Sequence, residues 1–279
     1  MSRAGIVDSL SRAGRDVNED AFGATGDLAW IIDGATGVSE RRFTPDVSDA
    51  RWYAETLNRT LAELAQRPSC RLGPLLATAI HQTSAAFNVF GGELQETHDP
   101  PSASVAIVRV HDDMIEYAIL GDCAVLVRSG RGVVSLNDRR IEPFERVIVE
   151  RAHSLAVSGI RDMHAAREAL LPALRELRDH MNRPGGYYVA SLDPAVAENA
   201  VTGVIQGVRP PLVLVTDGFM RLYEVFGAYT ATSFYERATT AGLDALYREL
   251  RRMEDDDADL TRHARVKQKD DASSLVISW

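Results

Sequence analysis

Carboxylate side chains stand beside apolar runs at four distant places in this sequence. The four motifs are Arg15-Asp16-Val17-Asn18-Glu19-Asp20, Ile31-Ile32-Asp33-Gly34, Val215-Thr216-Asp217-Gly218 and Asp270-Asp271. A carboxylate next to a buried strand is costly unless a cation or a set of hydrogen bonds satisfies it. Four such places therefore suggest one shared cation site. Because all the candidate ligands are oxygens, the site favours the hard cations Mg²⁺ and Mn²⁺ over zinc.

A glycine directly follows two of these carboxylates, Asp33 and Asp217. Glycine allows the backbone to turn sharply and lets a ligand approach closely, so the carbonyl oxygen of Gly34 is a further candidate ligand. Asp-Gly is also a common turn, and each pair alone is weak evidence for a metal site. The alternative interpretation is that the four motifs are separate turns and helix caps.

Composition restricts the classes of protein to which the chain can belong. Its 279 residues carry a net charge of −9 and a pI near 5.3, which argues against a surface that binds nucleic acid or an anionic membrane. Neither a signal segment nor an apolar run approaching ~20 residues is visible, so we expect a soluble cytoplasmic protein. The two cysteines, Cys70 and Cys123, have neither disulfide-framework nor zinc-site spacing.

The elements that must position the carboxylates can be read from hydrophobic periodicity. A short apolar strand is expected at 28–33, and Thr44-Pro45-Asp46 has the pattern of a helix start. Two amphipathic helices should follow, each with one apolar stripe. The stripes are Ala50, Ala54, Leu57, Leu61 and Leu64 in the first helix, and Leu72, Leu76, Ala79, Thr83 and Phe87 in the second.

The remainder of the chain alternates between strand and helix patterns. Short strands at 103–110, 114–120, 123–128 and 132–136 are expected to form an antiparallel meander. Residues 141–184 show charge and helical periodicity, and Pro172 should start or kink a helix there. Further strands are expected at 187–189, 199–205, 211–216 and 272–278, and helices at 230–240 and 243–254. Consecutive strands without crossover helices indicate an α+β fold and argue against a parallel Rossmann sheet.

In order and spacing, these motifs resemble those of the metal-dependent protein phosphatases of the protein phosphatase 2C-like (PPM) family. The matching segments include Arg15 to Asp20, Asp33-Gly34, Asp217-Gly218 and Asp270-Asp271, with Ser102-Ala103-Ser104 and Gly121-Asp122-Cys123-Ala124 between them. The resemblance covers nearly the whole chain. It implies a sandwich of two antiparallel β-sheets flanked by helices on both faces. It also implies a single catalytic domain over 1–279, with a variable flap around 138–198.

The resemblance further implies a role for each matching residue. Asp33 would bridge two metal ions, with Asp217 and Asp270 on the first ion and Glu19 and the Gly34 carbonyl on the second. Asp20 would contact the ions only through their water molecules. Arg15 would bind the substrate phosphate, since a planar guanidinium suits a tetrahedral oxyanion. Asp122 would hold a third, weaker ion together with Asp217.

The implied reaction is hydrolysis of a phosphomonoester with Mn²⁺ or Mg²⁺, in which two ions activate water for in-line attack on phosphorus. The implied substrate is a phosphoserine or phosphothreonine protein, with a partner kinase opposing the reaction. Two alternatives remain: a catalytically weak phosphoprotein-binding or regulatory module, and a phosphatase for a small metabolite. The chain departs from the family pattern at Ala35, where animal members often carry histidine, and at Cys123-Ala124, where serine and arginine are usual.

Overall fold

The computed structural model describes residues 3–39, 42–66, 71–90, 99–130, 132–160 and 162–279. Ten strands form two five-stranded sheets in which every neighbouring pair is antiparallel. The first sheet has the order β1 (Gly5–Arg12), β10 (Ala272–Ser278), β9 (Arg209–Val215), β6 (Ala124–Ser129), β7 (Gly132–Leu136). The second has the order β2 (Asp20–Thr25), β3 (Leu28–Ala35), β4 (Ser102–Val110), β5 (Met114–Leu120), β8 (Val201–Gln206).

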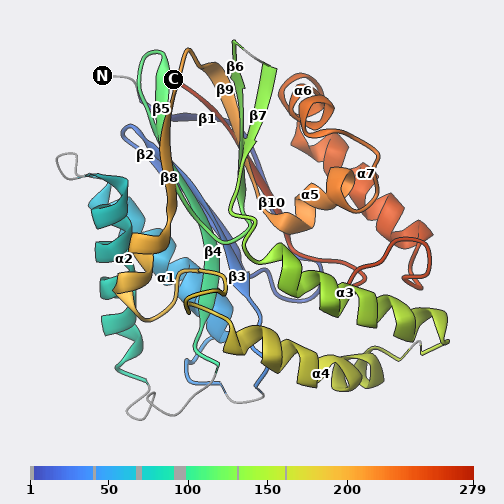
Figure 1. Ribbon diagram of the computed structural model, residues 1–279. Helices are drawn as coiled ribbons and strands as arrows, with labels where there is room; N and C mark the ends of the chain where they lie inside the picture. The colour runs from blue at the N-terminus through green and yellow to red at the C-terminus, as the bar shows by residue number, and fades with distance from the viewer. Residues whose placement is uncertain (1–2, 40–41, 67–70, 91–98, 131, 161) are drawn as a thin grey trace.

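The two sheets pack face to face, and alternation along each strand divides its side chains between two cores. In β3, Ala29 and Ile31 enter the core between the sheets, where they join Leu212 and Leu214 of β9. Trp30 and its neighbours on the opposite face of β3 pack under α1 (Asp49–Leu64) and α2 (Leu72–Phe87). The outer face of the other sheet is covered by α5 (Asp217–Glu224), α6 (Ala231–Ala241) and α7 (Leu243–Asp256) (Figure 1). The sandwich with helices on both faces is therefore confirmed.

Two helices lie outside these layers. The helices α3 (Glu142–Val157) and α4 (Met163–Asp179) pack against each other through a small apolar cluster of their own. In Figure 1 they run beneath the sheets, at the end opposite to the two chain termini. A short 3-10 helix, η2 (Pro194–Asn199), follows them. None of the helices in the described part of the chain is both long and apolar enough to cross a membrane.

Most of the predicted elements are present. Every residue of the two predicted apolar stripes is buried in α1 or α2. The strand at 272–278 is β10, and the helices predicted on either side of Gly242 are α6 and α7. Cys123 is a buried free thiol, whereas Cys70 lies outside the described residues.

Two predictions about strands were wrong. The four strands from 102 to 136 do not form one meander, because β4 and β5 lie in one sheet while β6 and β7 lie in the other. The chain crosses between the sheets at Gly121, whose φ of +79° suits glycine. Residues 187–189 do not form a strand. The structure has only two isolated bridges here, one between Tyr187 and Met181 and one between Ala190 and Ala103.

Two predictions about helices were also wrong. The helix predicted from Thr44 begins only at Asp49, because the Asp49 carboxylate accepts hydrogen bonds from the backbone of Phe43 and Thr44 and holds that segment outside the helix. Pro172 lies inside α4. Both Pro172 and Glu168, whose carbonyl loses its helical donor, are exposed, so water can satisfy that carbonyl.

Candidate functional site

The register of three strands places the first carboxylates at one end of the sandwich. Asp33 continues the face of β3 that carries Ala29 and Ile31 into the space between the sheets. It pairs directly with Asp20 of β2 on one side and with Ser104 of β4 on the other. The segments 15–20 and 31–34, which the sequence analysis treated separately, therefore meet through ordinary antiparallel pairing.

The third motif arrives from the opposite sheet. Strand β9 ends at Val215, and Asp217 is the first residue of α5, where a carboxylate benefits from the positive end of the helix dipole. Gly218 lies so close to the loop before β10 that an added Cβ would stand 1.9 Å from the carbonyl oxygen of Asp271. A side chain at position 218 is therefore excluded by the backbone that carries the fourth motif.

Asp271 links the loop between β1 and β2 to the loop before β10. Its carboxylate accepts hydrogen bonds from the backbone N–H of Gly14 at 2.8 Å and of Glu19 at 2.7 Å. These bonds fix the loop that carries Arg15 and Glu19 against the loop that carries Asp270. The Asp270-Asp271 motif alone does not reveal this role, because nothing in the spacing of Asp271 distinguishes a backbone acceptor from a metal ligand.

A cavity of about 670 Å³ is lined by seven of the eight candidate residues. They are Arg15, Glu19, Asp33, Gly34, Asp122, Asp217 and Asp270. The eighth, Asp20, is buried behind them and is 6% exposed. Helices α3 and α4 contribute another wall of the same cavity. All four acidic motifs therefore converge on one place, as predicted for a shared site.

The central carboxylates are poorly satisfied by the protein itself. Desolvation raises the pKa of Asp33 well above its usual range, and the neighbouring Asp20, Asp217 and Asp122 raise it further. Desolvation likewise raises the pKa of Asp20, with a contribution from Asp271 and Asp217. The pKa of Asp122 is raised to about 7, first by desolvation and then by Asp217, against the hydrogen bond from Ser104. Such a cluster has a deficit of positive charge.

The donor set in the centre fits a hard divalent cation. Oδ1 of Asp20 is buried without a hydrogen-bond partner in the described part of the chain, while Oδ2 accepts a bond from Thr216 at 3.2 Å. This unpaired oxygen lies among the carboxylates of Asp33, Asp122 and Asp217, and carboxylate oxygens are the ligands that Mg²⁺ and Mn²⁺ prefer. Yet no three His, Cys, Asp or Glu side chains among the described residues already surround a space for an ion.

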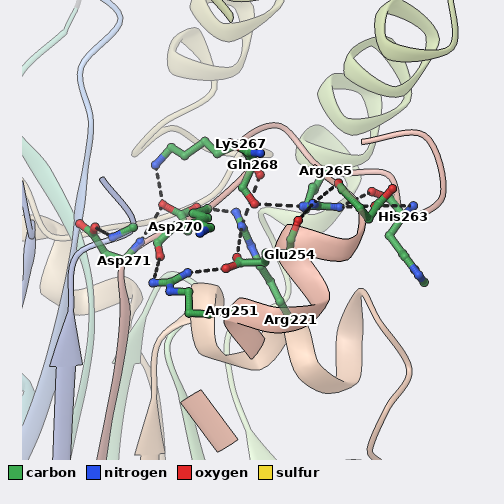
Figure 2. Close-up of polar contacts among 12 residues, drawn as sticks. Arg221, Arg251, Glu254, His263, Arg265, Lys267, Gln268, Asp270 and Asp271 are labelled. Atoms are coloured by element: carbon green, nitrogen blue, oxygen red, sulfur yellow. Dashed lines mark hydrogen bonds and ion pairs between the residues drawn. The ribbon is translucent and has the colours of Figure 1, made fainter. Parts of the chain in front are cut away.

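Two of the predicted ligands have other partners. The carboxylate of Glu19 accepts hydrogen bonds from the hydroxyl groups of Thr36, at 2.5 Å, and Ser48. Asp270 forms ion pairs with Nη2 of Arg221 at 2.7 Å and with Nζ of Lys267 at 2.8 Å (Figure 2). Although burial opposes it, these two cations hold the pKa of Asp270 below its usual value. The type of donor at the centre of the site therefore suits a divalent cation, whereas the carboxylate of Asp270 is already paired with two cations of the protein.

The structure adds three residues that the sequence analysis missed. Glu145 of α3 and Glu224 of α5 line the cavity, and burial is the main cause that raises the pKa of each. Nearby carboxylates raise the pKa of Glu145 further, whereas Arg139 partly opposes the rise at Glu224. Arg178 of α4 donates to the carbonyl oxygen of Thr36 at 3.0 Å and to Ser102 at 2.7 Å, and so ties α4 to the loop after Asp33. Glu145 and Arg178 belong to helices without a motif, and Glu224 lies seven residues after Asp217, outside the motif that begins its helix, so no sequence signal marked them.

These charges predict how the metal-free protein responds to pH. Asp20, Asp33 and Asp122 have raised pKa values in the folded state, so between about pH 4 and 7 the folded protein binds more protons than the unfolded chain. Stability must therefore fall as pH rises through this window. The lowered pKa of Asp270 changes the stability only below about pH 3.8, which lies outside this window. In a chelating buffer we expect a higher unfolding temperature at pH 5 than at pH 8, measured by calorimetry. A flat or rising profile would contradict the burial of unpaired carboxylates.

Comparison with solved structures identifies the fold. The serine/threonine phosphatase PstP/Ppp of Mycobacterium tuberculosis matches with a TM-score of 0.57 at 13% identity, over 99% of this chain and 97% of that chain. PppA of Pseudomonas aeruginosa, a key regulatory component of T6SS, matches with a TM-score of 0.57 at 15% identity, over 99% and 98%. The catalytic domain of PstP in complex with two manganese ions matches with a TM-score of 0.55 at 12% identity, over 99% and 97%.

Comparison by sequence gives no match, either to a protein-family model or to a curated protein. The fold is the protein phosphatase 2C-like sandwich, as the ordered motifs implied.

Proposed function

We propose that this chain is a metal-dependent protein serine/threonine phosphatase of the protein phosphatase 2C-like (PPM) family. The observation that carries the proposal is the meeting of four acidic motifs, separated by up to about 250 residues, in one cavity on a fold shared with bacterial serine/threonine phosphatases. A shared fold alone does not determine function. The carboxylates at the bottom of the cavity, which lack compensating charge, provide the specific argument.

Each residue of the site has a role that follows from its position. Arg15 is exposed at the cavity wall, four residues before Glu19, and would bind the phosphate group of the substrate through paired hydrogen bonds. Asp33 and Asp217, which both line the cavity and are close enough for the charge of Asp217 to raise the pKa of Asp33, would hold the catalytic cation. Asp20 would orient water from behind Asp33. When bound, Mn²⁺ or Mg²⁺ would supply an activated water and positive charge for the phosphoryl oxygens.

Asp122 is held differently from these residues. Its Oδ1 accepts a hydrogen bond from Oγ of Ser104 at 2.6 Å, and its backbone N–H donates to the same hydroxyl at 3.3 Å. These two hydrogen bonds hold the Asp122 carboxylate in the wall of the cavity that Asp217 also lines. The negative charge of Asp217 contributes to the raised pKa of Asp122. We infer that Asp122 serves a weaker, additional cation together with Asp217.

We propose that the substrate is a phosphoprotein, supplied by a partner kinase. At about 670 Å³ the cavity has room for a phosphorylated side chain, and α3 and α4 form the wall that such a substrate would meet. Because these helices belong to the segment 138–198, which matches the family poorly, we expect them to select the substrate. A small-metabolite phosphatase and a regulatory module that binds phosphoproteins without turnover are the competing functions.

A metal-supplemented assay tests the proposal. We expect the purified protein to release phosphate from phosphoserine or phosphothreonine peptides with Mn²⁺ or Mg²⁺, and to lose this activity in EDTA. Full activity in exhaustively chelated protein, with no metal found by mass spectrometry, would refute the metal dependence. Peptide binding without turnover would favour the regulatory module. Turnover of small phosphates that phosphopeptides cannot inhibit would favour the metabolite phosphatase.

A further inference from the structure

Both oxygens of the Asp270 carboxylate are already bound. Oδ2 accepts from Nη2 of Arg221 at 2.7 Å, and Oδ1 accepts from Nζ of Lys267 at 2.8 Å. The backbone N–H of Asp271 also donates to Oδ1, at 3.2 Å. These bonds leave little of the carboxylate's acceptor capacity free, and a metal ion at Asp270 would stand beside two positive charges that repel it.

Arg221 is fixed in this position. It lies one helical turn after Asp217 on α5, so both side chains project from the same face toward the cavity. Its guanidinium is 8% exposed, and its Nη1 donates to Oε1 of Glu254 at 3.0 Å and to the carbonyl oxygen of Lys267 at 3.4 Å. Glu254 is fully buried, and Arg251 pairs with its second oxygen. Removing Arg221 from Asp270 would therefore disturb a buried network (Figure 2).

Lys267 is the more accessible of the two cations. Its side chain is 41% exposed, and it reaches Asp270 from the loop before β10. Although burial of the ammonium works against its charge, Asp270, and more weakly Asp217 and Asp33, raise the pKa of Lys267. The ammonium therefore faces the same carboxylates that the resemblance assigns to the metal ions. Together, Arg221 and Lys267 bring two positive charges to Asp270, which is the formal charge of one divalent cation.

We propose that Arg221 and Lys267 are built-in cations that replace one of the two metal ions, so that this chain binds a single tight divalent cation. That tight ion would lie between Asp33 and Asp217, apart from the weaker ion inferred at Asp122, because both carboxylates line the cavity and neither forms an ion pair with a side-chain cation among the described residues. The inference rests on the proposed metal dependence of the site and corrects its stoichiometry. It accounts for the difference between the centre of the site, where the type of donor suits a divalent cation, and Asp270, which is already paired with two cations of the protein.

Calorimetric titration with Mn²⁺, with the bound metal counted by mass spectrometry after gel filtration, tests the proposal. We expect one tight Mn²⁺ per wild-type chain. Lys267→Gln removes from Asp270 one positive charge that would repel a metal ion. We therefore expect the total affinity for Mn²⁺ to rise about tenfold, or a second ion to bind. The matched control is Lys269→Gln. Lys269 lines the same cavity but pairs with Asp255 at 2.6 Å, so its removal should leave Mn²⁺ affinity within about twofold.

The outcomes separate this inference from the proposed function. Two tight ions in the wild-type chain, or equal Mn²⁺ binding by wild type and Lys267→Gln, would overturn the replacement of a metal by side chains while leaving a metal-dependent phosphatase intact. No Mn²⁺ binding by any variant would overturn the metal site itself and the inference with it. An unfolding transition measured in EDTA confirms that each variant is folded, and Lys267→Met provides a second uncharged variant of similar length.

Discussion

Replacing Asp33 by asparagine should abolish phosphatase activity and, at the same time, stabilise the metal-free protein. Asp33 pairs with Asp20 in the sheet and faces the cavity together with Asp217, so the central cation would lose its main ligand. We expect kcat/KM to fall by about 10³-fold or more, because even the outer partners of metal ligands are worth 10–100-fold. Titration calorimetry should show a matching loss of Mn²⁺ affinity.

The gain in stability is the more unusual half of this prediction. The raised pKa of Asp33 means that its charge opposes folding at neutral pH, so an amide of the same shape should raise the unfolding temperature at pH 8 in EDTA. The control is Asp113→Asn, an exposed residue in the turn before β5, which should change neither property. Near-normal rate and metal binding in Asp33→Asn would exclude Asp33 as the central ligand.

The second large effect is expected at Gly218, where a methyl group should damage both stability and activity. The added Cβ of Gly218→Ala would lie 1.9 Å from the carbonyl oxygen of Asp271 and 3.1 Å from Cβ of Asp270. Backbone atoms cannot move aside as a flexible side chain can, so the loop before β10 or the start of α5 must shift. We expect a loss of about 3 kcal/mol in the free energy of unfolding, at the upper end of overpacking costs. Urea titration in EDTA measures this loss without the contribution of bound metal.

Gly73 provides the matched control for this substitution. It lies at the second position of α2, and an added Cβ there would meet nothing within 4 Å. Gly73→Ala should therefore be neutral or should stabilise the protein by up to about 1 kcal/mol, because alanine loses less backbone entropy in a helix. Equal urea midpoints for the two variants would show that the close approach at Gly218 relaxes without cost.

Local patterns predicted the parts of this molecule that depend on local physics. The helices and strands follow from periodicity, because one face of each element must be buried. The convergence of the acidic motifs follows from the cost of leaving carboxylates beside buried strands. The division of β4–β7 between two sheets was not predictable from periodicity, since a hairpin and a crossing between sheets differ only at Gly121 and its neighbours.

The partners of individual site residues were the least predictable feature. Glu19 bonds to Thr36 and Ser48, and Asp270 pairs with Arg221 and Lys267, although the motifs alone mark both acids as metal ligands. A motif records which residue stands at a position, whereas these contacts depend on side chains that arrive from other elements. Glu145 and Arg178 were missed for the same reason, since α3 and α4 carry no motif that points toward the cavity.

The bond between Asp271 and the backbone of Glu19 spans 252 positions of the sequence, and β1 pairs with β10 along its whole length. On a ribosome that adds roughly 5–20 residues per second, the first of these segments waits about 10–50 s for its partner. During that interval strand β1 lacks its partner β10, and the loop that carries Arg15 lacks the two hydrogen bonds to Asp271. A nascent chain can therefore form the helix-covered β2–β5 layer well before the cavity that holds the acidic motifs is complete. Translation through residues 270–278 would then be the event that closes the cavity and brings Asp270 and Asp271 to the other acidic motifs.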